Sequence, residues 1–229
     1  MLITKLLTNF CIDMNDLRIE KKFIFGKGKE NNLKASLLKN GFSEIFKPRQ
    51  ISSIYLDTEN FDFARDNING VSKRKKIRFR WYNRDLRNIY LEEKAKQNFQ
   101  VNKIVKKINA HVDKDYIVRD LKKYFYDIKN RFNSFNYRFV LKVNYLRSYW
   151  ISDNKKYRAT VDQNLIINPI NNLSFNLNLN ETILEFKFLP KYESSFRDFY
   201  YKKNFNFRAK KFSKYIQSFN LLEDSGLIT

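Results

Sequence analysis

The stretch from Arg74 to Tyr82 reads RKKIRFRWY and alternates between basic and apolar side chains. Arg74, Lys76, Arg78 and Arg80 share one parity, and Ile77, Phe79 and Trp81 share the other. Successive side chains of a β-strand point to opposite faces, so these residues predict a strand with one cationic and one apolar face. The fold must place the cationic face either in solvent or around an interior that holds anions.

The same division recurs along the chain. Strands are predicted at 18–25, 51–59, 73–82, 88–97, 137–150, 156–165 and 182–190, and the Asn-rich residues 168–180 predict a loop or an irregular strand. One face of these strands carries aromatic and aliphatic residues. Their shared polar face carries Glu20, Lys22, Tyr90, Glu92, Lys94, Lys96, Tyr145, Arg147, Arg158, Thr160, Asp162, Glu185 and Lys187.

One charged strand face is ordinarily a solvated face of an antiparallel sheet. The same charged face recurs on nearly every predicted strand, which favours a different arrangement. The apolar faces can be covered by amphipathic helices, because helical spacing is seen at 29–40, 113–132 and 193–220, with a short helix or turn at 60–70. We therefore expect an α+β fold: an eight-stranded antiparallel β-barrel with a charged interior and flanking helices outside.

Length and composition agree with one domain over residues 1–229, its core at about 18–220. Only 5 Gly and 3 Pro argue against long linkers, and the hydrophobic content of 43% can form a sizeable core. No run of 18 apolar residues and no signal peptide are seen, so no membrane segment is expected. With the single cysteine, Cys11, this leads us to expect a cytoplasmic protein.

The net charge of +21, from 45 basic and 24 acidic residues, implies a polyanionic partner such as nucleic acid, an anionic membrane surface or a phosphate-rich molecule. RNA recognition uses exposed aromatic platforms, whereas most aromatics here lie on predicted core faces, so nucleic acid is disfavoured. A cation-lined tunnel needs water and a multiply charged anion, because like charges repel and their desolvation is costly.

Acidic residues lie on the same predicted face as the cations. The chain has one cysteine and one histidine, His111, which excludes a zinc site of the Cys/His type. The acids either pair with the cations or hold Mg²⁺ or Mn²⁺, which prefer oxygen ligands. They are Glu20, Glu92, Asp162 and Glu185. Cations together with a carboxylate-bound metal are what phosphoryl transfer requires.

Several stretches carry a family resemblance. They are IEKKF (19–23), SIYLDTENFDF (53–63), KIRFRWY (76–82), LEEKAK (91–96), YLRSYW (145–150), RATVDQNL (158–165), ILEFKF (183–188) and KKFSKYI (210–216). In this order the chain resembles the catalytic domain of the vacuolar transporter chaperone (VTC) polyphosphate polymerases, within the triphosphate tunnel metalloenzyme (CYTH-like) superfamily. The resemblance implies an eight-stranded antiparallel tunnel that binds ATP, polyphosphate or pyrophosphate, and Mn²⁺ or Mg²⁺.

The resemblance also implies roles for individual residues. The catalytic cations would be Arg78, Arg80, Lys94, Arg147 and Lys214. Phosphate or nucleotide would be bound by Lys22, Lys103, Tyr145, Lys211, Ser213 and Arg158. Glu185 would hold the metal, with Glu20, Glu92 and Asp162 as further candidates, and Asp57 would be a supporting acid. The implied activity is ATP-dependent transfer of the γ-phosphoryl group to a growing polyphosphate chain.

Two positions depart from the pattern. Hydrolases of the superfamily carry Glu-x-Glu-x-Lys on the first strand, and Arg18 replaces the first Glu here, which favours a polymerase. Asn67 stands where the family usually has a basic residue. No phosphate-sensing or membrane domain is expected beside the tunnel, so regulation by inositol phosphates and coupling to translocation are not expected.

Two alternatives stay open. One is a triphosphatase, polyphosphatase or cyclase of the same superfamily, and the other is a non-catalytic polyphosphate- or RNA-binding module. The length of the product and any partner subunit also stay open.

Overall fold

The computed structural model describes residues 18–98, 100–109, 111–129, 137–202 and 208–228, and the statements below concern this part of the chain. The strands are β1 (Ile19–Gly26), β2 (Phe42–Thr58), β3 (Arg74–Tyr82), β4 (Tyr90–Gln97), β5 (Gln100–Lys107), β6 (Tyr137–Ser152), β7 (Arg158–Pro169), β8 (Leu177–Leu179) and β9 (Glu181–Phe188). The helices are α1 (Glu30–Lys39), α2 (Asp62–Ile68), α3 (Ile117–Lys129), α4 (Glu193–Lys202) and α5 (Lys214–Asp224).

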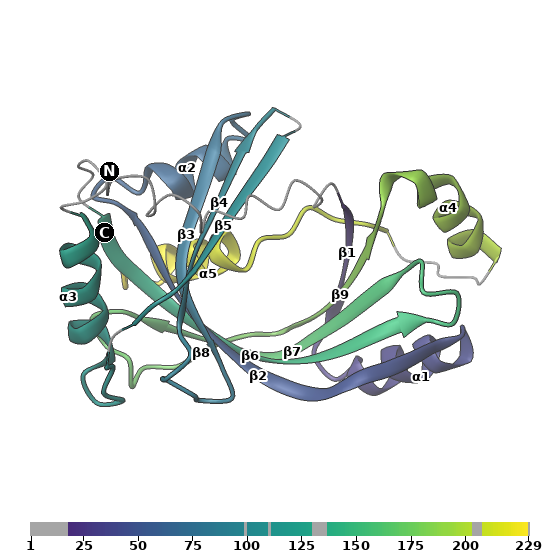
Figure 1. The fold of residues 1–229 in the computed structure, drawn as a ribbon, viewed down its shortest axis with the longest axis horizontal. Helices are drawn as coiled ribbons and strands as arrows, with labels where there is room; N and C mark the ends of the chain where they lie inside the picture. Colours follow the sequence, from purple (N-terminus) through teal and green to yellow (C-terminus); the bar gives the residue numbers. More distant parts are fainter. Residues whose placement is uncertain (1–17, 99, 110, 130–136, 203–207, 229) are drawn as a thin grey trace, which may run out of the picture.

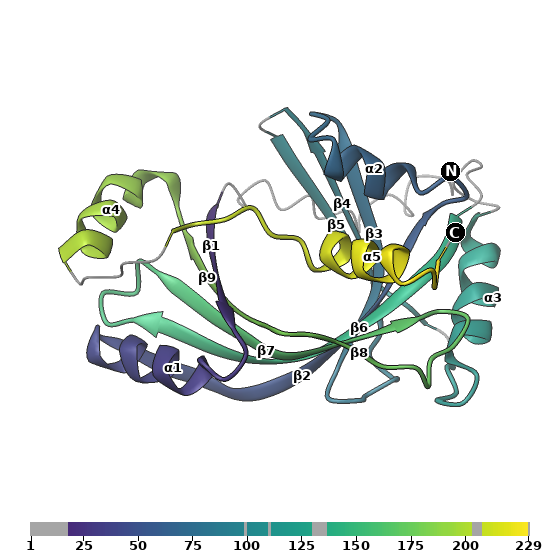
Figure 2. The same ribbon diagram turned by 180° about the vertical axis from the view of Figure 1, so that it is seen from behind.

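All strands belong to one antiparallel sheet in the order β1-β9-β7-β6-β2-β3-β4-β5, with β8 beside β7. The sheet curves into a barrel-like trough, with β3, β4 and β5 rising on one side and β1 and β9 on the other (Figures 1 and 2). In the described part of the chain β1 and β5 are the two edges and do not pair with each other. The α+β, antiparallel barrel-like fold with flanking helices is confirmed, although backbone hydrogen bonds do not close it.

The strand register places the charged faces on the concave side. Residues directly opposite in an antiparallel pair share a face, and Lys22 lies opposite Glu185, Arg78 opposite Glu92 and Arg147 opposite Asp162. The cationic face of RKKIRFRWY therefore lines the interior of the trough.

The convex side carries the apolar faces in two separate clusters. In one cluster, Ile77, Phe79 and Trp81 of β3 pack with Leu121 and Phe125 of α3. In the other, residues of α1 and α4 cover β1, β6, β7 and β9; its members include Phe23, Leu33, Leu37, Trp150, Phe186, Phe188 and Phe196. Burial of these side chains stabilises the curved sheet by about 1.5–3 kcal/mol for each large residue.

The last helix departs from the expected arrangement. A helix was expected over 193–220 on the outside, whereas α4 ends at Lys202 and α5 begins only at Lys214. Ser213 is extended (φ −133°, ψ 120°), and its hydroxyl accepts a bond from the Ile216 amide, which makes it the N-cap that starts a new helix. Helix α5 packs inside the trough, where its apolar residues meet Tyr55, Val143, Tyr145 and Ile183 (Figures 1 and 2).

Two strands also differ from expectation. β5 was not predicted, because every residue of QVNKIVKK is exposed and the segment lacks a clear apolar alternation. β2 begins at Phe42 rather than near residue 51, and its first part is largely exposed. No described helix is long and apolar enough to cross a membrane.

Candidate functional site

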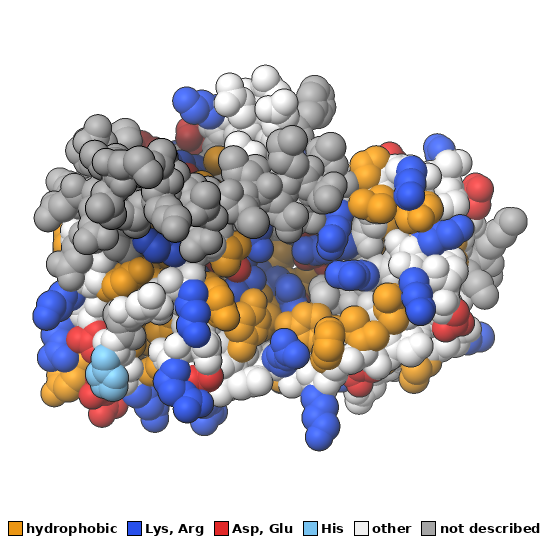
Figure 3. Space-filling view, in the orientation of Figure 1, with side chains coloured by type: hydrophobic (Ala, Val, Ile, Leu, Met, Phe, Trp, Pro, Cys, Tyr) orange, Lys and Arg blue, Asp and Glu red, His pale blue; other side chains and the backbone are white. Residues whose placement is uncertain are grey.

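The concave face gathers cations from six elements. Figure 3 shows Lys and Arg side chains in a central hollow of this side of the molecule. Strands β1, β3, β4, β6 and β9 and helix α5 contribute Lys22, Lys76, Arg78, Arg80, Lys94, Arg147, Lys187 and Lys214, which lie among four carboxylates. Apart from Lys76, these cations form three groups, distinguished by the carboxylates that they contact.

The first group surrounds Glu92 of β4. Its Oε2 accepts bonds from Arg78 Nε at 2.7 Å and Arg78 Nη2 at 2.5 Å, and Arg80 Nη1 lies 3.7 Å away. Burial alone would raise the pKa of Glu92, but Arg78, Arg80 and Lys103 outweigh it and lower the pKa to about 2. Glu92 is therefore ionised and holds both arginines in place.

The second group surrounds Asp162 of β7, which is fully buried. Arg147 grips it with two bonds of 2.5 and 2.7 Å, and Lys214 Nζ donates to Oδ2 at 2.5 Å. Burial opposes the charge of Asp162, but Arg147 and Lys214 hold its pKa well below the usual range. Tyr145 completes the group, because its hydroxyl accepts from Arg80 Nη2 at 3.2 Å and its ring lies 4.7 Å below Lys214 Nζ.

The third group contains the two remaining carboxylates. Lys187 Nζ lies 3.0 Å from Glu185 Oε1 and 3.3 Å from Glu20 Oε1, so one ammonium group contacts both side chains. Burial would raise the pKa of Glu185, but Lys187, Lys22, Arg147 and Lys214 lower it to about 2. Two ionised carboxylates that converge on one cation have the chemistry of a divalent-metal site.

The four candidate metal ligands do not meet at one point. Glu92 and Asp162 are occupied by arginine and lysine, and no described cluster of three or more His, Cys, Asp or Glu residues could hold a metal ion. Mg²⁺ is commonly bound by one or two carboxylates together with substrate phosphates and water. Glu20 and Glu185 fit that mode.

Lys76 was part of the predicted strand pattern but was not among the predicted site residues. Its Nζ donates to Ser213 Oγ at 2.9 Å, and nearby Lys22 Nζ donates to the Phe212 carbonyl at 3.1 Å. Burial, with added repulsion from Lys22, Lys94, Arg74 and Arg78, lowers the pKa of Lys76 to about 7. Its parity with Arg78 and Arg80 was the sequence signal that could have placed it in the site.

The other predicted residues lie at the margin of this surface or have structural contacts. Lys103, Arg158 and Lys211 are exposed; Lys103 lies 3.7 Å from Glu92, and Arg158 lies opposite Lys187 in the register. Asp57 is fully buried and accepts bonds from the Phe63 and Ala64 amides of α2 and from the Tyr215 hydroxyl. Asn67 donates to the Phe63 carbonyl at 2.7 Å.

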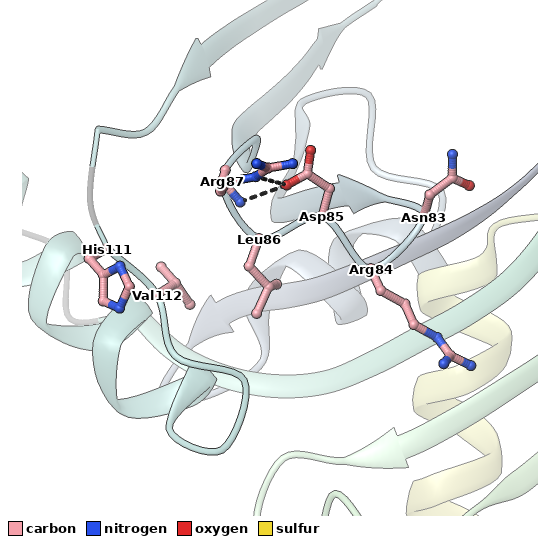
Figure 4. Close-up of a pocket in the computed structure, with 7 residues that line it drawn as sticks. All are labelled: Asn83, Arg84, Asp85, Leu86, Arg87, His111 and Val112. Carbon is pink, nitrogen blue, oxygen red and sulfur yellow. Dashed lines mark hydrogen bonds and ion pairs between the residues drawn. The ribbon is translucent and has the colours of Figure 1, made fainter.

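Two pockets flank the β3–β4 turn. One, of about 580 Å³, includes Glu92 and Lys103 together with Arg49, Tyr82 and Tyr90, so it shares residues with the first cation group. The other, of about 540 Å³, lies between residues 83–87 and His111 with Val112 (Figure 4). In Figure 4 Asp85 binds Arg87 and Arg84 points away from both, so this second pocket shares no side chain with the cation groups above.

This arrangement suits a chain of linked phosphates. Arginine forks bind phosphate oxygens in pairs, and lysines add point charges along a curved surface. The concave-face cations named above outnumber the carboxylates, so the face retains positive charge after its internal ion pairs form.

The comparisons with known proteins agree with this geometry. A family model described as VTC domain matches residues 17–223. Among solved structures the fold is similar to a candidate adenylyl cyclase from Hippeastrum described as having a dominant triphosphatase activity (TM-score 0.56, 12% identity, 93% of this chain and 97% of that chain).

Candidate adenylate cyclases from two bacteria have the same fold. The protein from Bacillus halodurans gives a TM-score of 0.56 at 12% identity, over 89% of this chain and 97% of that chain. The protein from Vibrio parahaemolyticus gives 0.52 at 12% identity, over 89% and 98%. At these identities the likeness concerns the fold alone. No match was found among curated proteins.

Proposed function

Because this chain belongs to the VTC domain family, we propose that it is a metal-dependent enzyme that transfers the γ-phosphoryl group of ATP to the end of a polyphosphate chain. The family and the tunnel fold together support a function in binding or converting phosphate compounds. The finer assignment depends mainly on one observation: the concave face carries fixed arginines and lysines along a path long enough to span several elements of the sheet.

In the proposed reaction, a terminal oxygen of polyphosphate attacks the γ-phosphorus of ATP. The new P–O bond lengthens the chain by one phosphate, the bond from the γ-phosphorus to the β–γ bridging oxygen breaks, and ADP leaves. The attacking oxygen is already anionic, so the reaction needs no general base. Catalysis is then chiefly positioning and neutralisation of charge.

Different side chains of the concave face would position the phosphates and neutralise their charge. Arg78 and Arg80, held by Glu92, and Arg147 and Lys214, held by Asp162, would grip phosphate oxygens on both sides of the scissile bond. Their ion pairs fix the side chains before substrate binds, which reduces the reorganisation needed in the transition state. A divalent ion bound by Glu20 and Glu185 would add positive charge at the donor phosphates, with Mn²⁺ or Mg²⁺ as the candidates.

A triphosphatase is the second candidate. It is favoured by the Hippeastrum structure, whose description names a dominant triphosphatase activity on the same fold. Water would then replace the polyphosphate oxygen as the acceptor, and phosphate would be released.

A single assay separates these functions. Purified protein would be incubated with ATP and Mn²⁺, the products run on a gel stained for polyphosphate, and free phosphate measured in parallel. We expect a polyphosphate ladder that is lost in Arg80→Gln and Glu185→Gln, each with activity reduced by about 100-fold or more, because the first removes a cation that stabilises the transition state and the second removes a proposed ligand of the metal ion. Lys39→Gln, an exposed change at the end of α1, is the control and should retain full activity.

Free phosphate without a ladder would identify a triphosphatase instead. Absence of both products, with polyphosphate still bound, would refute enzymatic activity and leave a binding module. A chelator should abolish turnover, and an activity unaffected by chelation would contradict the metal site at Glu20 and Glu185.

A further inference from the structure

We propose that Lys76, with Lys22, Lys94 and Ser213, forms a phosphate-binding subsite that takes up a proton from solvent when the polyanion binds. The proposal rests on the proposed function, because its ligand is a chain of linked phosphates. It adds a proton-coupled site to the concave face.

The geometry brings three ammonium groups to one place. Lys76 lies directly opposite Lys94 in the β3–β4 register, so both side chains leave the sheet on the same face. Lys22 reaches the segment that precedes α5 through its bond to the Phe212 carbonyl, and Lys76 reaches the next residue, Ser213. The backbone bond from the Lys210 amide to the Lys22 carbonyl, at 2.9 Å, holds that segment against β1.

Lys76 differs from the other buried cations in what it contacts. Arg78, Arg147, Lys187 and Lys214 each have a carboxylate within 3.0 Å. Within the described residues, Lys76 donates to a hydroxyl group and makes no ion pair with a carboxylate.

The groups around Lys76 are nearly all cationic. Lys22 faces it from β1, Arg74 and Arg78 from β3 and Lys94 from β4. Glu20 of β1 lies 3.9 Å from Lys22 Nζ, 3.8 Å from Lys94 Nζ and 3.3 Å from Lys187 Nζ. Glu20 is thus shared among three other lysines.

This environment favours the neutral amine of Lys76. Burial and the four neighbouring cations lower the pKa of Lys76 to about 7, so at pH 8 most molecules carry an uncharged amine there. A phosphate group placed between Lys22, Lys76 and Lys94 reverses the balance, because an adjacent anion favours the protonated form. The proton comes from solvent and goes to Lys76 Nζ, and no covalent bond changes.

The test is calorimetric titration with tripolyphosphate at pH 8 in two buffers that differ in ionisation enthalpy, which gives the number of protons taken up on binding. Wild type is compared with Lys76→Met, which cannot be protonated, and with Lys76→Arg, which is always charged. We expect wild type to take up close to one proton more than either variant. Lys39→Gln, which lies outside the trough, should behave as wild type.

Affinity gives an independent readout. Relative to Lys76→Arg, the affinity of wild type should rise by up to about tenfold from pH 8 to pH 7, the limit for one coupled proton. If Lys76→Met does not fold, the comparison with Lys76→Arg remains decisive.

The outcomes separate this inference from the proposed function. Tight tripolyphosphate binding with the same proton uptake in wild type, Lys76→Met and Lys76→Arg would overturn the subsite and leave the proposed function untouched. A folded wild-type protein that binds no tripolyphosphate would overturn both.

Discussion

The carboxylates of the concave face have two kinds of task. Glu92 and Asp162 are bound to arginine and lysine so closely that they serve as anchors for those cations. Glu20 and Glu185 share the ammonium group of Lys187 instead, and it is this pair that remains suitable for a metal ion. Breaking a buried pair leaves an uncompensated charge, so the anchors are also important for stability.

The lowered pKa of Glu92 predicts how the free energy of unfolding depends on pH. Its pKa is lowered in the folded protein to about 2, so its ion pairs stabilise the fold above the ordinary value of 4.5 and are lost as the pH falls towards 2. Between pH 5 and pH 2 this group should contribute a loss of up to about 3 kcal/mol in the free energy of unfolding. Urea denaturation across this range should show a smaller loss in Glu92→Gln than in wild type.

Glu93→Gln is the matched control for that measurement. Glu93 is the next residue on β4, lies on the other face of the strand and pairs with Lys75 at 2.9 Å, with its side chain about one-third exposed. It should keep the wild-type pH dependence. Equal slopes in wild type and Glu92→Gln would show that the Arg78–Glu92 pair does not control acid stability.

At the scale of elements, α5 links the core of the molecule to its cations. The Tyr215 hydroxyl donates to buried Asp57, and the Tyr215 ring stacks on Tyr55 at 4.9 Å. The Tyr55 hydroxyl in turn accepts from Arg78 Nη1 at 3.2 Å. The same helix begins with Lys214 on Asp162, so the position of α5 determines the position of two parts of the cation surface.

This linkage predicts the effect of removing one hydroxyl group. Tyr215→Phe keeps the ring stacking but takes one donor from the Asp57 carboxylate, which is buried, and should lower the free energy of unfolding by about 1–3 kcal/mol. Denaturation in urea measures the loss. Tyr116→Phe, at an exposed position before α3, should change stability little; an equal effect at both positions would refute the anchoring role of Tyr215.

At the scale of the whole molecule, the net charge of +21 is concentrated in part on the concave face. Binding of a polyanion to such a surface releases counterions, so its affinity falls as salt rises. The fixed ion pairs with Glu92 and Asp162 limit how far the cations must move on binding.

Salt dependence therefore reports which cations contact the polymer. For polyphosphate, a plot of log affinity against log salt should lose about one unit of slope in Lys94→Gln, because one contact to a phosphate is removed. Lys94 is half-exposed and suits this test, since its loss leaves no buried acid unpaired. Lys39→Gln should leave the slope unchanged, and an unchanged slope in Lys94→Gln would place the polymer elsewhere.

The sequence by itself determined most of the strands and the two faces of each of them. The alternation at residues 74–82 was confirmed as β3, with Ile77, Phe79 and Trp81 buried under α3 and Arg78 and Arg80 on the concave side. This was possible because strand periodicity is a local property that each segment carries without its neighbours. The order of the motifs along the chain likewise indicated the family.

Only the tertiary structure decided which charges meet. The pairing of Asp162 with Lys214, the bond from Lys76 to Ser213 and the entry of α5 into the trough join residues far apart in the sequence. β5 was missed for a related reason, since an exposed edge strand is formed by its hydrogen bonds to β4 and needs no apolar alternation. Register and curvature of the sheet bring these groups together, and neither can be read from a single strand.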